Sequence, residues 1–279
     1  ERAAARKWLR RQASLPEERM PSLRRPLFLV TGYTDEDAMC WQGPESFMRL
    51  GPRIYRNWAT HAHMIVFPRD EVLGAEHGAL AGRAMDSFFD FGDLLRQEML
   101  RRVPEAATDL AYDVLCHSMG GLNTAVALMD LETSPPRLPP APSGQRLGKA
   151  HHMMTLDTPW RGVPSMDFRR KFAHTEAQKR QGAALFRESP QLARLAGAFT
   201  QLPARVHRLT CYRPEGATQI EVPAQSADLY GESPEWKPQR EACGYTAVVV
   251  RGASHSGERG ITTSPITLED VFRRRLGVG

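Results

Sequence analysis

The sequence predicts an α/β protein with a mostly parallel central sheet and helices on both faces. Short apolar runs alternate along the chain with segments of helical periodicity, which is the pattern of strands joined by crossover helices. The 279 residues are 41% hydrophobic, enough for one domain with a single core. Because ligands of such sheets bind at the carboxyl ends of the strands, we expect a functional site there.

The N-terminal half begins with an extension at residues 1–25, whose Arg, Ala and Glu content predicts an exposed helix. Residues 27–30 and 64–67 are short apolar runs bounded by Pro or Gly, and we predict buried parallel strands there. Apolar residues recur at helical spacing from residue 76 to residue 102, which indicates a long crossover helix.

The C-terminal half continues the alternation with two interruptions. Residues 132–147 are rich in Pro and are expected to form a surface loop. Residues 161–204 have helical periodicity in their middle and end, and we predict a cap inserted above the sheet. The remaining strands are predicted at residues 111–115, 153–156, 206–212 and 245–250, and the remaining helices at 122–131 and 268–276.

The net charge of the chain does not favour a nucleic-acid partner, and it leaves contact with a membrane surface open. The net charge of +5 is compatible with contact with a membrane surface, but the arginines are spread along the chain rather than gathered in a binding stripe. No apolar run approaches the roughly 20 residues that span a bilayer. The first residue is Glu1, so a removed leader is compatible with the sequence, and both the compartment and the oligomeric state stay open.

The sequence motifs indicate neither a metal site nor a nucleotide-binding site. The four cysteines show neither CxxC pairing nor zinc spacing. His61 and His63 lack an evident third ligand, and a strand at the sheet edge explains their spacing better than a metal site. Since there is also no glycine-rich phosphate loop, we expect no metal and no cofactor.

The segment from Cys116 to Gly121 lies where a predicted strand turns directly into a predicted helix. A serine at such a turn is held in a strained conformation, and small neighbours let strand and helix approach each other. Ser118 would also stand at a helix N-terminus, where backbone N–H groups favour a developing oxyanion. We therefore predict that Ser118 is a nucleophile.

Four segments in order resemble the lipases and esterases of the α/β-hydrolase superfamily. Residues 117–122 (HSMGGL) resemble the nucleophile elbow and residues 27–33 (LFLVTGY) the first strand with its oxyanion loop. Residues 155–162 (TLDTPWRG) resemble the Thr-Pro-His-x-Gly segment, and residues 254–256 (SHS) resemble the histidine loop. The resemblance implies an α/β-hydrolase domain over residues 26–279.

The resemblance also implies roles for individual residues. His255 would be the general base, because it follows the last strand in the order that this fold requires. The oxyanion hole would use the backbone N–H of Met119 and a second one from Tyr33 or Thr34.

The acid of the catalytic triad is the open question. Most members of the superfamily carry an Asp at the position of Gln219, whose amide is neutral and would support His255 poorly. Gln219 follows the predicted strand at residues 206–212. Asp157 follows the strand before it, at residues 153–156, as the acid does in pancreatic-type lipases, and is our first choice. Glu221 is the second choice and Asp228 the third.

Together these features predict a carboxylesterase or lipase that acts through an acyl-enzyme on Ser118, without a cofactor. The apolar content of the predicted cap favours an acyl or lipid substrate. A thioesterase or acyltransferase would use the same nucleophile. A catalytically silent, hydrolase-like binding protein is a further alternative, because Gln219, Cys116 and Thr31 all depart from the superfamily pattern.

Overall fold

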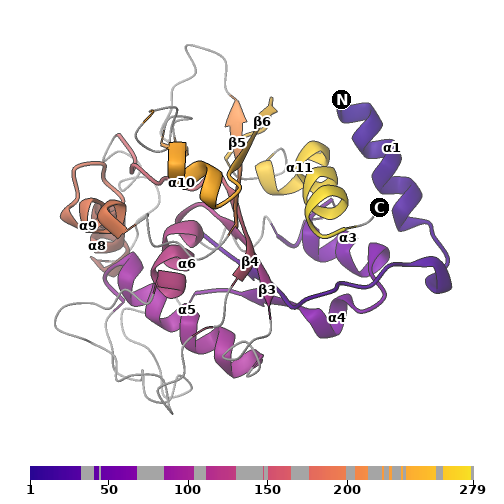
Figure 1. The fold of residues 1–279 in the computed structure, drawn as a ribbon, viewed down its shortest axis with the longest axis horizontal. Coiled ribbons are helices and arrows are strands. Elements are labelled where there is room, and N and C mark those ends of the chain that lie inside the picture. The colour runs from indigo at the N-terminus through magenta and orange to yellow at the C-terminus, as the bar shows by residue number, and fades with distance from the viewer. Residues whose placement is uncertain are drawn as a thin grey trace.

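The computed structural model forms a parallel sheet between two layers of helices (Figure 1). Within its described residues, no helix is long and apolar enough to cross a membrane. The described residues are 1–32, 41–43, 45–67, 85–103, 111–129, 147, 150–164, 176–198, 205–212, 222, 226–227, 234, 237–255 and 260–277.

The sheet has six strands within the described residues, in the order β2-β1-β3-β4-β5-β6, and every neighbouring pair is parallel. The chain therefore builds one edge with β2, returns past β1 to β3, and then extends the sheet toward β6. In sheets of this kind, ligands bind outside the carboxyl ends of the strands where the strand order reverses, which here are β1 and β3. The strands are β1 (Leu27–Val30), β2 (Ala62–Ile65), β3 (Tyr112–His117), β4 (Ala150–Leu156), β5 (Arg205–Tyr212) and β6 (Thr246–Arg251).

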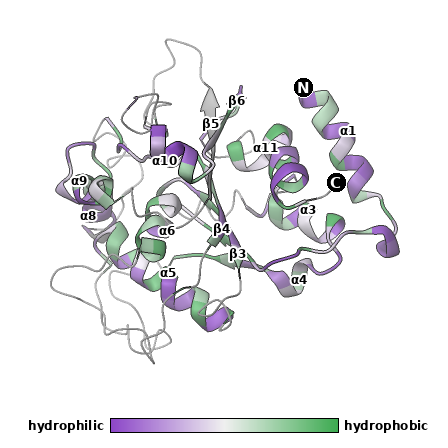
Figure 2. Ribbon diagram, in the orientation of Figure 1, coloured by the Kyte–Doolittle hydropathy of each residue, from purple (hydrophilic) through white to green (hydrophobic). Residues whose placement is uncertain are grey.

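One face of the sheet is covered by α5 (Phe88–Arg102) and α6 (Met119–Met129), with α8 (Glu176–Ala184) and α9 (Pro190–Ala198) beside them. The helix α6 carries no charged residue and is mostly apolar in its second half (Figure 2), which fits its place between α5 and the sheet, where residues 119–127 are all buried. The close crossing depends on Gly92 of α5, where a Cβ would come within 2.5 Å of the side chain of Val126.

The other face is covered by helices from both ends of the chain. Its core is an aromatic cluster in which Phe47, Tyr55 and Trp58 pack around Phe272. The helical elements of this layer are α1 (Arg2–Ala13), η1 (Glu17–Arg19), α3 (Phe47–Ile54), α4 (Trp58–His61), η7 (Ile261–Thr263), α11 (Pro265–Glu269) and the π-helical η8 (Asp270–Arg275). A further short helix, α10 (Lys237–Ala242), precedes β6 in the chain.

The predicted fold class is confirmed, and the described strands lie within a few residues of their predicted positions. The N-terminal segment differs from the prediction, because α1 is not simply exposed: Ala5 and Leu9 are buried where α1 packs on α11. The apolar face of this helix was too narrow to stand out among its arginines. The helices α3 and α4 were not predicted at all.

Two predicted segments lie partly outside the described residues. Of the predicted crossover helix, residues 88–102 are helical and residues 76–84 are not described. Of the Pro-rich segment 132–147, only residue 147 is described. The predicted cap contributes α8 and α9, and its function as a cap stays a prediction.

Candidate active site

Ser118 is the single residue between the end of β3 at His117 and the start of α6 at Met119. Its φ of 53° lies in the left-handed region, which costs a residue with a side chain about 1–3 kcal/mol. Two backbone hydrogen bonds hold this turn: Ser118 N–H donates to Leu156 O at 2.9 Å, and Gly121 N–H donates to Ser118 O at 3.1 Å. The strand therefore presents the Ser118 hydroxyl at the carboxyl edge of the sheet.

Two glycines allow α6 to start so close to the sheet. A Cβ on Gly120 would lie 2.4 Å from the carbonyl oxygen of Thr31, just beyond β1, and a Cβ on Gly121 would lie 2.1 Å from Thr158 Oγ1. Neither position accepts a larger residue without displacing its neighbour. The sequence pattern Ser-x-Gly-Gly thus has a direct steric reason.

Cys116, where the lipases and esterases that the sequence resembles carry the first glycine of the nucleophile elbow, is a core residue. Its side chain is fully buried and its thiol donates to Met154 O at 3.2 Å across the sheet. Burial raises the pKa of the Cys116 thiol to about 12, which keeps the sulfur neutral. The substitution is therefore accommodated by packing.

Asp157 follows the end of β4 as Ser118 follows the end of β3. The strands β3 and β4 pair in register with His117 opposite Leu156, so Ser118 and Asp157 both follow the last paired residue. Asp157 also has a left-handed φ, 52°, and it is completely buried. The register of two adjacent parallel strands thus places a hydroxyl and a carboxylate side by side.

His255 joins these two side chains. Its Nδ1 lies 2.7 Å from Asp157 Oδ2 and its Nε2 lies 3.0 Å from Ser118 Oγ. Because the carboxylate accepts a hydrogen bond, Nδ1 carries the proton and Nε2 offers its lone pair to the Ser118 hydroxyl. All three side chains are buried, so water competes little for these bonds. The geometry is that of a nucleophile, a base and an acid that orients the base.

His117 is a neighbour of the site that the sequence reasoning missed. Its Nε2–H donates to the backbone carbonyl of His255 at 2.8 Å, and the two imidazole rings lie with their centroids 4.7 Å apart. The fully buried His117 ring therefore fixes the main chain that carries His255. The sequence offered a signal for this role, because His117 directly precedes the predicted nucleophile Ser118 and ends the strand that carries it.

The remaining predicted site residues are only partly described. Met119 is the first residue of α6, where its amide precedes the first hydrogen-bonded turn and can donate to a ligand. Tyr33, Thr34, Glu221, Asp228 and Gln219 lie outside the described residues. Across the described part of the chain, no group of three His, Cys, Asp or Glu side chains is arranged to hold a metal ion.

No protein-family model matches this sequence, and no curated protein matches it in sequence. Among solved structures, phospholipase PlaB from Legionella pneumophila is similar over 91% of this chain and 58% of its own, with 14% identity and a TM-score of 0.57. The same phospholipase in complex with thio-NAD gives 14% identity, 91% and 56% coverage, and a TM-score of 0.56.

A putative cell surface hydrolase from Lactobacillus plantarum has 14% identity over 91% of this chain and 92% of its own, with a TM-score of 0.48. With 58% of the phospholipase covered, the present chain spans less than two thirds of the length of that protein. At this identity, the similarity to the phospholipase establishes a common fold.

Proposed function

We propose that this chain, which has the α/β-hydrolase fold, is a serine hydrolase that cleaves carboxylic esters through an acyl-enzyme on Ser118. The observation that carries the proposal is the buried hydrogen-bonded chain from Ser118 Oγ through His255 to Asp157, with distances of 3.0 Å and 2.7 Å. It stands at the carboxyl edge of the sheet, where ligands of such folds bind. The left-handed turn at Ser118 supports the same role, because it places the hydroxyl directly ahead of a helix N-terminus.

In the proposed reaction, Ser118 Oγ attacks the ester carbonyl carbon while His255 Nε2 accepts the hydroxyl proton. Asp157 stabilises the resulting imidazolium without taking its proton. The tetrahedral oxyanion is held by the amide of Met119, and by that of Tyr33 or Thr34 as the second donor.

Collapse of the intermediate breaks the bond to the alcohol oxygen, which leaves with the proton from His255. A water molecule then gives a proton to His255 Nε2 and attacks the acyl carbon. The bond from that carbon to Ser118 Oγ breaks, Ser118 Oγ takes the proton from His255, and the carboxylic acid leaves.

A lipid ester is the substrate that we propose first. The predicted cap at residues 161–204 carries Met166, Phe168, Phe172 and Phe186, which would supply apolar surface for an acyl chain, whereas Leu185 of the same segment is buried in the core. A protein with the same fold is a phospholipase, which supports this substrate class. The same acyl-enzyme would accept a thioester or pass its acyl group to an alcohol, so transfer to an added alcohol belongs among the measured products.

The test compares wild type with Ser118→Ala on p-nitrophenyl esters from short to long acyl chains. We expect turnover that depends on Ser118 and increases toward longer chains. Ser46→Ala is the matched control, because Ser46 is an equally buried serine that precedes α3, on the other side of the molecule from α6. A Ser118→Ala protein as active as wild type would refute the proposal, and so would a wild type that neither turns over any ester nor reacts with a fluorophosphonate.

A further inference from the structure

The helix α1 concentrates positive charge without compensating acids. Between Arg2 and Ala13 it carries Arg2, Arg6, Lys7, Arg10 and Arg11, and hydrophilic residues recur along it in Figure 2. Like charges four residues apart on a helix disfavour it by a few tenths of a kcal/mol per pair. Burial of its apolar side against α11 offsets this cost.

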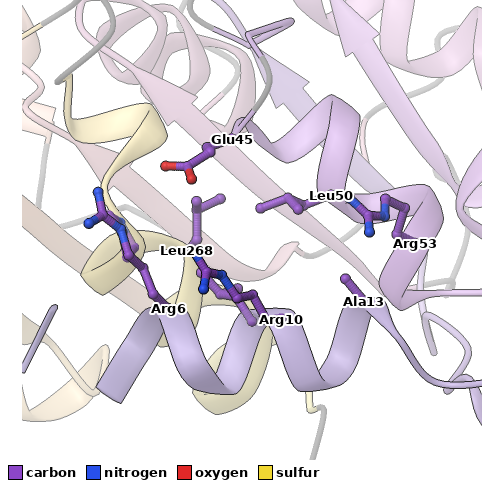
Figure 3. Close-up of a pocket in the computed structure, with 9 residues that line it drawn as sticks. Arg6, Arg10, Ala13, Glu45, Leu50, Arg53 and Leu268 are labelled. Atoms are coloured by element: carbon purple, nitrogen blue, oxygen red, sulfur yellow. The ribbon is translucent and has the colours of Figure 1, made fainter. Parts of the chain in front are cut away.

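Three arginines surround a pocket between α1, α3 and α11, with a volume of about 410 Å³. Figure 3 shows Arg6 and Arg10 extending from α1 and Arg53 from α3, with Leu50 and Leu268 between them. The three guanidinium groups stand at the exposed rim, whereas the leucines are buried at the floor. The pocket thus combines a cationic rim with an apolar floor.

The rim has an excess of positive charge. Glu45 is the one carboxylate of its lining, which leaves two net positive charges from three arginines. Within the described residues, Arg6, Arg10 and Arg53 take part in no ion pair. Elsewhere arginines do find acids, as at Arg101 with Glu98, 2.7 Å apart. The pocket therefore offers guanidinium donors that nothing in the described fold uses.

We propose that this pocket binds the phosphodiester headgroup of an anionic phospholipid. Guanidinium groups form charge-assisted hydrogen bonds with phosphate oxygens and remain charged at every relevant pH. The apolar floor suits the glycerol and the first methylene groups, which inorganic phosphate lacks. The rest of α1 adds a favourable field, since each basic side chain near an anionic membrane contributes about fivefold to binding. This site is separate from Ser118 and does not depend on the proposed hydrolase activity.

The test measures binding of a short-chain phosphatidylglycerol, kept below its critical micelle concentration, by isothermal titration calorimetry. We expect Arg6→Gln/Arg10→Gln to weaken binding about a hundredfold, because each charge-assisted hydrogen bond contributes about tenfold. The matched control is Lys7→Gln/Arg11→Gln, which removes the same charge from the same helix outside the pocket. It should weaken binding about twofold, since exposed charges are screened.

Gln is a good helix former, so both double variants should keep the thermal midpoint of wild type. Glu45→Gln should tighten binding, because it removes the carboxylate that faces the bound anion. Equal losses in the two double variants would overturn the pocket in favour of a diffuse charge effect. Inorganic phosphate binding as tightly as the lipid would overturn the lipid assignment, and absence of lipid binding to wild type would overturn the proposal entirely.

Discussion

Replacement of Asp157 by Asn tests the acid of the triad more sharply than any other change. Asn has nearly the shape of Asp and tolerates a left-handed φ, so the backbone at 52° gains no strain. Only the charge and the hydrogen-bond polarity change. The introduced side-chain amide can also donate to Nδ1 of His255, which would hold the imidazole in the tautomer that cannot accept the Ser118 proton.

The magnitude follows from the observed contact. With Asp157 Oδ2 2.7 Å from His255 Nδ1, an effective dielectric constant of about 20 gives roughly 6 kcal/mol between the carboxylate and the imidazolium of the transition state. That energy corresponds to about four orders of magnitude in rate. We therefore expect kcat for a p-nitrophenyl ester to fall about ten-thousandfold in Asp157→Asn, with KM nearly unchanged.

The other two candidate acids provide the controls. Glu221→Gln and Asp228→Asn should each keep activity within about threefold of wild type. An Asp157→Asn variant that retains more than about a tenth of the wild-type kcat would refute the assignment of Asp157 as the acid. Loss of activity in Glu221→Gln or Asp228→Asn would refute it equally. Circular dichroism of each variant would separate a loss of chemistry from a loss of fold.

Three further measurements test the surroundings of the site. His117→Phe should lower kcat about tenfold at constant KM, because the buried carbonyl of His255 loses its donor; His117→Gln should restore most of it, and failure of that rescue would argue against positioning by hydrogen bonding. Gly120→Ala should lower the free energy of unfolding by about 2 kcal/mol or more, since its Cβ would lie 2.4 Å from Thr31 O, and a denaturant midpoint equal to wild type would contradict this. With the pKa of Cys116 raised from 9.0 to about 12, its contribution to stability is present below pH 9 and is lost as pH rises toward 12; the unfolding midpoint should fall less over this range in Cys116→Ala than in wild type.

Local patterns were enough for the parts of this protein that short segments specify. Apolar runs and helical periodicity predicted the strand and helix alternation, because burial of a strand or of one helix face imposes a pattern on neighbouring residues. The turn at Ser118 was recognisable for the same reason, since the glycines that allow it lie within three residues. By contrast, α3 and the burial of α1 depend on contacts with helices near the other end of the chain.

The sequence by itself determined the fold class, the nucleophile candidate and the histidine candidate, while it left three acids open. Only the tertiary structure shows that Asp157 reaches His255, through the register of β3 beside β4, whereas Glu221 and Asp228 lie outside the described residues. That register is a non-local property, because it depends on how two strands separated by a crossover align in the sheet. The partnership of His117 with His255, 138 residues away, has the same origin. Side chains that meet at a sheet edge are chosen by strand order and alignment, which no short segment records.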